Sequence, residues 1–129
     1  MPTIGLTIHY DISGKFFMAL HHATSGERID VRPLRDRLRN EPTKTLFKSD
    51  HLEVIRTVLA AGKDIPAHHV AGESTVQCLE GCLELTVGRE TILLRAGELI
   101  CVAGGEEHAF MAIQDCSLLR TLVLMRYPL

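Results

Sequence analysis

The stretch from Gly62 to Gly81 reads GKDIPAHHVAGESTVQCLEG. It begins with a glycine and proline turn, carries adjacent histidines at His68 and His69, and is then interrupted by a Gly-Glu pair. Apolar and polar residues alternate after this break, which is the pattern of a half-buried β-strand. The closing pair Glu80-Gly81 stands before another β-rich run, so it predicts the turn of a hairpin.

This stretch resembles the first sequence signature of the cupin family. That signature runs Gly, five residues, His-x-His, three or four residues, Glu, six residues, Gly. Gly62, His68 and Gly81 fall in register with it. Two positions depart from it, because Val70 stands at the second His and Ser74, or Thr75 with the longer spacing, stands at the Glu.

A second stretch, from Gly97 to His108, reads GELICVAGGEEH and resembles the second cupin signature. That signature runs Gly, five residues, Pro-x-Gly, two residues, His, three residues, Asn. Gly97, Gly105 and His108 match it, whereas Ala103 replaces the proline and Ala112 the asparagine. The resemblance extends over about residues 50 to 125 and leaves the first forty or so unexplained.

The resemblance implies an all-β fold, the double-stranded β-helix or jelly-roll barrel of cupins. The strand pattern agrees independently, since short β-rich runs separated by Gly or Asp turns are typical of sandwiches and barrels. The strands expected after the first histidines are the one that contains Gln77, Cys82–Val87, Thr91–Leu94, Leu99–Val102, Ala109–Ile113 and Leu118–Met125, with Leu52–Leu59 before them.

The barrel is expected over residues 44–129, preceded by an N-terminal extension over residues 1–43. In the extension a short strand at Ile29 is expected to lead into a helical turn, because Pro33 suits a first helical position and Leu34 and Leu38 are four residues apart.

The first residues allow two interpretations. The alternating piece Leu6-Thr7-Ile8-His9-Tyr10 could be an added strand of the domain. Alternatively, residues 1–17 could lie outside the native domain, with Met18 as the natural start. The sequence alone leaves both open.

Length and composition indicate one globular domain. The chain has 129 residues, of which 46% are hydrophobic and 23% charged, and its net charge is −2. Lys and Arg are scattered, with no basic face and no interleaved aromatics, so nucleic-acid binding is not expected. No apolar run is long enough to span a membrane and no signal peptide begins the chain, so we expect a cytoplasmic protein.

The four cysteines, Cys78, Cys82, Cys101 and Cys116, form no Cys-x-x-Cys pair and no zinc-site spacing. They are expected to be small buried apolar residues in a reducing compartment. Nucleophilic catalysis has no sequence support either, because the chain has no Gly-x-Ser-x-Gly motif and no phosphate-binding glycine loop.

The resemblance implies a divalent metal inside the barrel, held in many cupins by three His and one Glu. Carried over by position, this assigns His68 and His108 as ligands. Three imidazoles and a carboxylate suit iron, nickel, manganese or zinc. With two of the four ligands replaced, Gln77, Glu73 or His69 would have to supply the third.

Which of these side chains faces inward depends on the strand. Successive strand residues point to opposite faces, so His68 and His69 cannot both face the interior of a regular strand. A bulge at Ala71-Gly72 would turn Glu73, Thr75 and Gln77 inward. A regular strand would instead turn Ser74, Val76 and Cys78 inward. The sequence predicts a site of His68, His108 and Gln77, or histidines that only form hydrogen bonds in a polar cavity.

Two arginines, Arg56 and Arg120, interrupt otherwise apolar strands. An arginine that faced the barrel interior would need an anionic partner or ligand, because an unpaired buried charge is costly. Most strand arginines face solvent. An inward one would indicate a ligand that carries a carboxylate.

Three functions are therefore considered. The first is a cupin that binds a divalent metal, a small organic ligand or both inside the barrel. The second is a metal-dependent dioxygenase or isomerase-like enzyme that acts on a small organic acid or sugar. The third is a structural or regulatory dimerisation domain, which a filled barrel interior would indicate. In each case we expect a homodimer, with Leu118–Met125 and Ile29–Leu46 as segments that could cover sheet edges.

Overall fold

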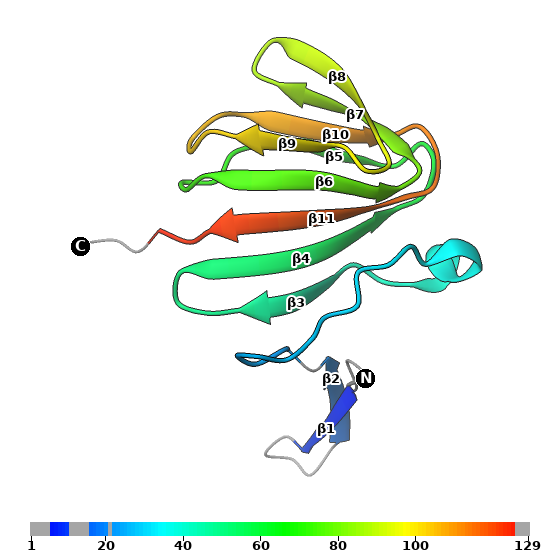
Figure 1. Cartoon of the computed structure of the whole chain (residues 1–129), viewed down its shortest axis with the longest axis vertical. Helices are drawn as coiled ribbons and strands as arrows, with labels where there is room; N and C mark the ends of the chain where they lie inside the picture. Colours follow the sequence, from blue (N-terminus) through cyan, green and yellow to red (C-terminus); the bar gives the residue numbers. More distant parts are fainter. Residues whose placement is uncertain (1–5, 11–15, 21, 126–129) are drawn as a thin grey trace.

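Two antiparallel β-sheets form the body of the protein (Figure 1). The computed structural model describes residues 6–10, 16–20 and 22–125. Within these ranges one sheet has five strands, in the spatial order β3 (Lys44–Lys48), β4 (Leu52–Leu59), β11 (Cys116–Val123), β6 (Ser74–Glu80) and β9 (Leu99–Val102). The other has four, in the order β5 (Asp64–His68), β10 (His108–Ala112), β7 (Cys82–Val87) and β8 (Glu90–Arg95).

The core lies between the sheets, because alternate residues of each strand point into the barrel. In β6 the buried residues are Ser74, Val76 and Cys78, while Thr75 and Gln77 between them stay partly exposed. This is the inward set that the sequence predicts for a regular strand without a bulge. The main cluster of buried side chains consists of Val76, Cys78, Leu83, Leu85, Leu94, Phe110, Ala112, Cys116 and Leu118.

The predicted hairpin at Glu80-Gly81 is wrong. Strand β6 pairs with β11 and β9, whereas β7 pairs with β10 and β8, so the turn carries the chain from one sheet to the other. Gly81 has φ +77°, and a Cβ there would collide with the carbonyl oxygen of Asp115. The hairpin lies one turn later, at Gly88-Arg89 between β7 and β8.

The expectation that Leu118–Met125 covers a sheet edge is also wrong. The strand here, β11, lies in the middle of the larger sheet, between β4 and β6 (red in Figure 1). All eight of its residues pair with β4. An edge strand would have left one side of its backbone unpaired, and the long apolar run is instead explained by its central place.

The N-terminal extension differs in part from its prediction. A 3₁₀ helix, η1 (Arg35–Asn40), forms where a helical turn was expected and buries Leu38. No strand forms at Ile29, since the described residues from 22 to 34 contain only turns, bends and irregular backbone. Strands β1 (Leu6–Tyr10) and β2 (Phe16–Leu20) pair in a separate two-stranded sheet, and residues 1–5 and 11–15 lie outside the described ranges.

A bulge in β6 turns one acidic side chain to the outer face of the sheet. Cys78 pairs with Leu118 but Glu80 pairs with Ser117, so Leu79 is the extra residue. In a regular strand Glu80, two residues after Cys78, would point into the barrel as Cys78 does. The bulge instead sends its carboxylate towards the segment that precedes η1.

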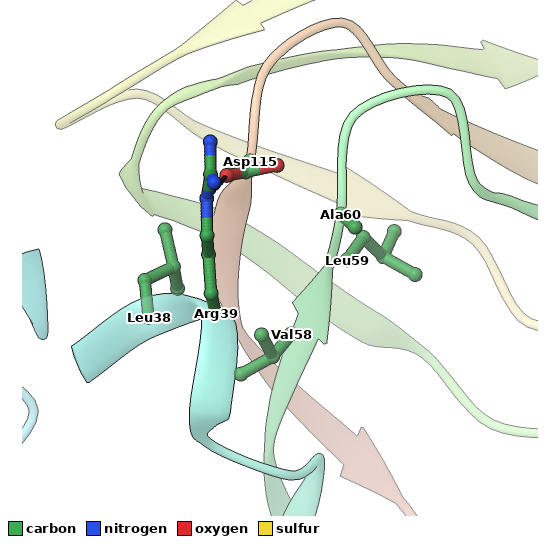
Figure 2. A pocket seen from close by; sticks show the side chains of 6 residues that line it. All are labelled: Leu38, Arg39, Val58, Leu59, Ala60 and Asp115. Atoms are coloured by element: carbon green, nitrogen blue, oxygen red, sulfur yellow. Dashed lines mark hydrogen bonds and ion pairs between the residues drawn. The ribbon is translucent and has the colours of Figure 1, made fainter. Parts of the chain in front are cut away.

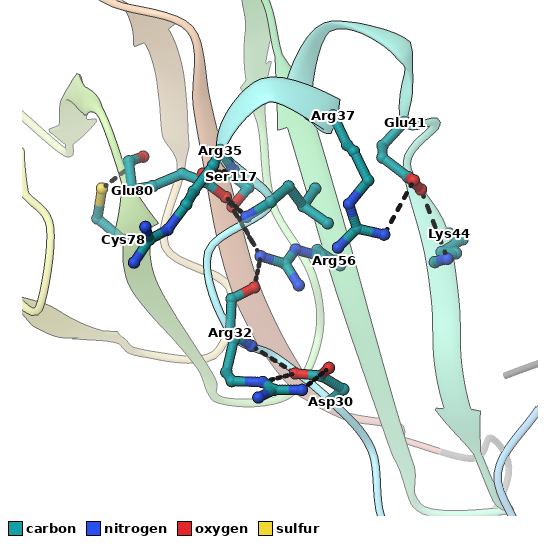
Figure 3. A network of polar contacts seen from close by, with 11 residues as sticks. Asp30, Arg32, Arg35, Arg37, Glu41, Lys44, Arg56, Cys78, Glu80 and Ser117 are labelled. Carbon is teal, nitrogen blue, oxygen red and sulfur yellow. Dashed lines mark hydrogen bonds and ion pairs between the residues drawn. The ribbon is translucent and has the colours of Figure 1, made fainter. Parts of the chain in front are cut away.

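The Glu80 carboxylate lies at the centre of a buried polar network (Figure 3). It accepts hydrogen bonds from the backbone N–H of Leu34 at 2.9 Å, from the N–H of Arg35 at 3.0 Å and from Ser117 Oγ at 2.6 Å. It also lies 3.3 Å from a guanidinium nitrogen of Arg56. Burial by itself would raise the pKa of Glu80, but these four donors hold that pKa below its usual value. The network fastens the extension to the barrel.

We predict that Glu80→Gln destabilises the protein by about 3 kcal/mol, because it leaves the buried charge of Arg56 without a counter-charge. Urea unfolding at pH 7 measures this. Glu84→Gln, at an exposed position of β7, is the matched control and should change stability by less than about 0.5 kcal/mol. Adding Arg56→Met to Glu80→Gln should recover part of the loss. A Glu80→Gln variant as stable as the control would contradict this role of the network.

Candidate functional site

The two histidines of the sequence signatures meet inside the barrel. Strands β5 and β10 are antiparallel neighbours, and their register places His68 directly opposite His108. The centres of the two imidazole rings are 4.3 Å apart. The ring of Phe110 lies edge-on to both, at 6.0 Å from His68 and 5.7 Å from His108.

Each imidazole is held by a backbone carbonyl two residues before it. The Nδ1 atom of His68 lies 3.0 Å from Pro66 O, and the Nδ1 atom of His108 lies 2.9 Å from Glu106 O. Because a carbonyl oxygen only accepts, each Nδ1 must carry the proton. In the neutral ring this leaves the lone pair on Nε2, free to bind a metal ion or accept a hydrogen bond.

The environment of His108 favours the neutral ring. The side chain is only 2% exposed, and this burial lowers its pKa below the usual value. The hydrogen bond to Glu106 partly opposes the effect, while the charges of His68 and Arg120 add to it. A neutral imidazole is the form that binds metals.

Gln77 does not join the two histidines. It lies on the opposite face of β6 from Val76 and Cys78, and it pairs with Leu119 and Leu99 on the outer side of the sheet. The predicted inward turn of Gln77 required a bulge at Ala71-Gly72. Those two residues lie instead in the loop between β5 and β6, so the strand begins regularly after them.

The other candidate ligands are placed as follows. Ser74, at the position of the family's Glu, is buried and faces the barrel interior beside Val102 and Leu122. His69 and Glu73 are exposed in the loop between β5 and β6. Among the described residues, no three His, Cys, Asp or Glu side chains gather closely enough to hold a metal ion. At the histidine pair the described part of the chain therefore offers two nitrogen donors and no carboxylate.

Arg120 faces the same interior. It pairs with Val76 across the β11–β6 ladder and alternates with the buried residues Leu118 and Leu122. Its guanidinium carbon lies 5.2 Å from the centre of the Phe110 ring, a cation–π distance. Arg56, the other arginine considered, lies on the outer face in the Glu80 network.

A separate cavity of about 320 Å³ lies outside the barrel interior, between η1 and the ends of β4 and β11 (Figure 2). It is lined by Leu38, Arg39, Val58, Leu59, Ala60 and Asp115. An ion pair of 2.9 Å joins Arg39 to Asp115 at its mouth, so the charged groups there already neutralise each other.

Both Cys78 and Cys116 are buried in the core. Burial raises the pKa of their thiols to about 11 and about 12, so neither thiol forms the reactive thiolate readily.

Residues 55–123, slightly more than half of the chain, match the cupin domain family. The chain belongs to the cupin family. Among solved structures, a conserved protein of unknown function from Streptococcus pyogenes has 24% identity and a TM-score of 0.66, over 84% of this chain and 98% of that one. An RmlC-like cupin with a double-stranded β-helix fold from Methanocaldococcus jannaschii has 16% identity and a TM-score of 0.63, over 77% of this chain and 94% of that one.

A salicylate 1,2-dioxygenase from Pseudaminobacter salicylatoxidans is also similar, with 22% identity and a TM-score of 0.55. The match covers 57% of this chain but only 21% of the dioxygenase. At these identities the likeness shows the fold, and the predicted double-stranded β-helix is confirmed. No curated protein matches the sequence. No helix in the described ranges is long and apolar enough to cross a membrane.

Sequence reasoning found His68 and His108 but left the orientation of Arg120 open. The strand pattern around it, with apolar residues on both sides, does not say which face is buried. The pairing of β11 with β6 decides it, because Arg120 lies opposite Val76, which is 1% exposed. The position of Arg120 two residues from two core leucines was the available signal.

We predict that the pH dependence of stability contains a contribution from His108. The folded protein takes up a proton there less readily than the unfolded chain does, so this contribution is complete above about pH 6.5 and is lost as pH falls towards the lowered pKa. Urea unfolding at pH 7.5, 6.5 and 5.5, in the presence of EDTA, measures it.

The matched variant is His108→Asn, whose amide can still donate to Glu106 O but does not titrate. The free energy of unfolding of the wild type should fall more steeply than that of the variant between pH 7.5 and 5.5. Equal slopes in the two proteins would contradict the prediction. The lowered pKa of Glu80 lies outside this window, because carboxylates titrate at lower pH.

Proposed function

We propose that this cupin binds a small organic ligand inside the barrel, at the His68–His108 pair. The observation that carries the proposal is that backbone carbonyls fix both Nδ1 atoms, on rings 4.3 Å apart, while neither Nε2 atom has a hydrogen-bond partner among residues 22–125. Two pre-oriented lone pairs with an aromatic ring beside them resemble the few polar anchors in a mostly apolar site that recognise small molecules.

We further propose that the pair can hold a divalent metal ion through the two Nε2 atoms. Imidazole nitrogens suit iron, nickel, manganese or zinc, although the set is only half of the usual cupin set and lacks a carboxylate. Gln77 has no part in this proposal. A bound ion would supply positive charge and open coordination positions for the ligand's oxygen atoms. The histidines' own task is to hold their lone pairs in a fixed direction.

A metal-dependent dioxygenase or isomerase-like activity on a small organic acid or sugar is the second candidate. Its support is the fold shared with the salicylate 1,2-dioxygenase and the metal-binding residue types at His68 and His108. It is weaker than the binding function because Ser74 replaces the family's Glu, and a hydroxyl is a poor substitute for a carboxylate ligand. A homodimer and a cytoplasmic location stay predictions.

Isothermal titration of the tag-free, EDTA-treated protein with Ni²⁺, Zn²⁺ and Fe²⁺ (the last without oxygen) tests the metal proposal. We predict one site per chain, weakened at least about tenfold in His68→Ala and in His108→Ala, because each removes one of two nitrogen donors. His69→Ala is the matched control, since His69 is adjacent in sequence but exposed, and its affinity should stay within about twofold.

Two results would contradict the metal proposal. One is the absence of binding by the wild type for all three ions. The other is binding that His68→Ala and His108→Ala leave unchanged, which would place the metal elsewhere. In either case the histidine pair would be left as a direct hydrogen-bonding contact for the organic ligand.

A further inference from the structure

Two arginines lie in the apolar strands of the larger sheet, and they differ in their partners. Arg56 is 3% exposed and has Glu80 as its counter-ion on the outer face. Arg120 points to the inner face, where it is partly buried among Leu118, Leu122 and Phe110. Arg56 therefore shows that a buried guanidinium with a structural role is paired with a carboxylate in this protein.

Arg120 has no such counter-ion among residues 22–125. Its guanidinium makes no hydrogen bond and no ion pair with these residues, and it lies over the ring of Phe110 in a cation–π contact. The acidic group whose charge acts on it is Glu53, and the Glu53 carboxylate accepts a hydrogen bond of 2.8 Å from Thr45 Oγ1. The fork of donors on Arg120 is therefore free to bind an anion.

Keeping this charge in the barrel is costly. Burial lowers the pKa of Arg120, and the charge of Glu53 opposes the shift only in part. An arginine nevertheless stays protonated, so the penalty is not relieved by losing the proton. If position 120 served only packing, Leu or Met would stabilise the protein more than Arg, because their side chains carry no desolvation penalty. This desolvation cost indicates that Arg120 has a role beyond packing, which becomes visible only when a ligand is bound.

The guanidinium and the histidine pair surround the same aromatic ring. Phe110 contacts Arg120, His68 and His108, so the three side chains lie around one ring. Both Arg120 and His68 keep part of their surface exposed, so a ligand from solvent can reach them. A planar fork of N–H donors matches a carboxylate in two parallel hydrogen bonds.

We propose that Arg120 is the anion-binding residue of the barrel, and that the ligand is a small organic carboxylate. Its carboxylate pairs with Arg120, and its remaining atoms lie against Phe110 and reach the histidine pair. The proposal rests on the proposed function in one respect, since it places the ligand in the same barrel. It names the chemical class that the proposed function leaves open, and it does not require a metal ion.

The test compares each carboxylate with its neutral amide. EDTA-treated, ¹⁵N-labelled protein is titrated with formate, acetate and benzoate, and separately with formamide, acetamide and benzamide, while the Nε–Hε resonance of Arg120 is followed by NMR. We expect at least one carboxylate to bind at least about tenfold more tightly than its amide and to shift this resonance, because a charge-assisted pair is lost in the amide. Formate is included because it is the smallest carboxylate, so a failure to bind it cannot be attributed to a lack of space.

The variants are Arg120→Met, Arg120→Lys and the control Arg89→Met, which removes an exposed arginine from the β7–β8 turn. Arg120→Met should abolish the preference for the carboxylate, Arg120→Lys should keep part of it, and Arg89→Met should keep all of it. The proposal is overturned if no carboxylate binds more tightly than its amide, or if Arg120→Met keeps the preference.

Thermal unfolding of the ligand-free variants separates binding from structure. Arg120→Met should be at least as stable as the wild type, because it removes an unpaired charge, whereas Arg56→Met should be less stable because it breaks a buried pair. Equal destabilisation by both would assign Arg120 a structural role and overturn the proposal. A Ni²⁺ titration of Arg120→Met distinguishes the two proposals, since binding of the metal depends on the histidines and binding of the carboxylate depends on Arg120.

Discussion

The central position of β11 is the constraint on which the rest of the structure depends. This strand pairs with β4 along its whole length and with β6 on its other side, so its register fixes which residues enter the barrel. Leu118, Arg120 and Leu122 point inward because Leu118 lies opposite Cys78 and Arg120 opposite Val76. A shift by one residue would send the arginine to the outer face and empty the core of two leucines.

The extra residue in β6 gives the two faces of this sheet different chemistry. It turns Glu80 to the outer face, where the carboxylate accepts a hydrogen bond from Ser117, pairs with Arg56 and caps the backbone of the extension. On the inner face the charge of Glu53 acts on Arg120, but its carboxylate accepts a hydrogen bond from Thr45 Oγ1, and within residues 22–125 no carboxylate forms an ion pair with Arg120. The same sheet thus carries the Arg56–Glu80 ion pair on its outer face and the guanidinium of Arg120 on its inner face.

Local sequence features were enough to predict most strands and the two histidines. Glycine turns and strand alternation depend only on neighbouring residues, so they can be identified in the sequence. The strands Leu52–Leu59 and Leu99–Val102 accordingly form where the sequence predicts them. His68 and His108 could be found because their spacing from the glycines is characteristic of the cupin family. Strand pairing depends on residues far apart in the chain, and this is why the turn at Glu80-Gly81 was misread as a hairpin.

The orientation of Gln77 and Arg120 belongs to the same class of long-range information. Local alternation says which residues share a face with Gln77 or Arg120, but which of the two faces is buried follows from the residue opposite on the neighbouring strand. Gln77 lies beside Leu119 on the outer face, and Arg120 lies beside Val76 within the barrel. The sequence therefore identified the two histidines that meet in the barrel, but it could not choose the polar group of the larger sheet that faces the same interior.

The proposed ligand site depends most directly on the proton positions of the histidine pair. Long-range ¹H–¹⁵N correlation spectra of the metal-free protein at pH 7.5 report which nitrogen of each ring carries the proton. The account predicts that both His68 and His108 are protonated at Nδ1, with Nε2 unprotonated, since each Nδ1 donates to a backbone carbonyl. A proton on Nε2 of either ring, or fast exchange between the two tautomers, would contradict it, because the lone pairs would then not be held towards the ligand.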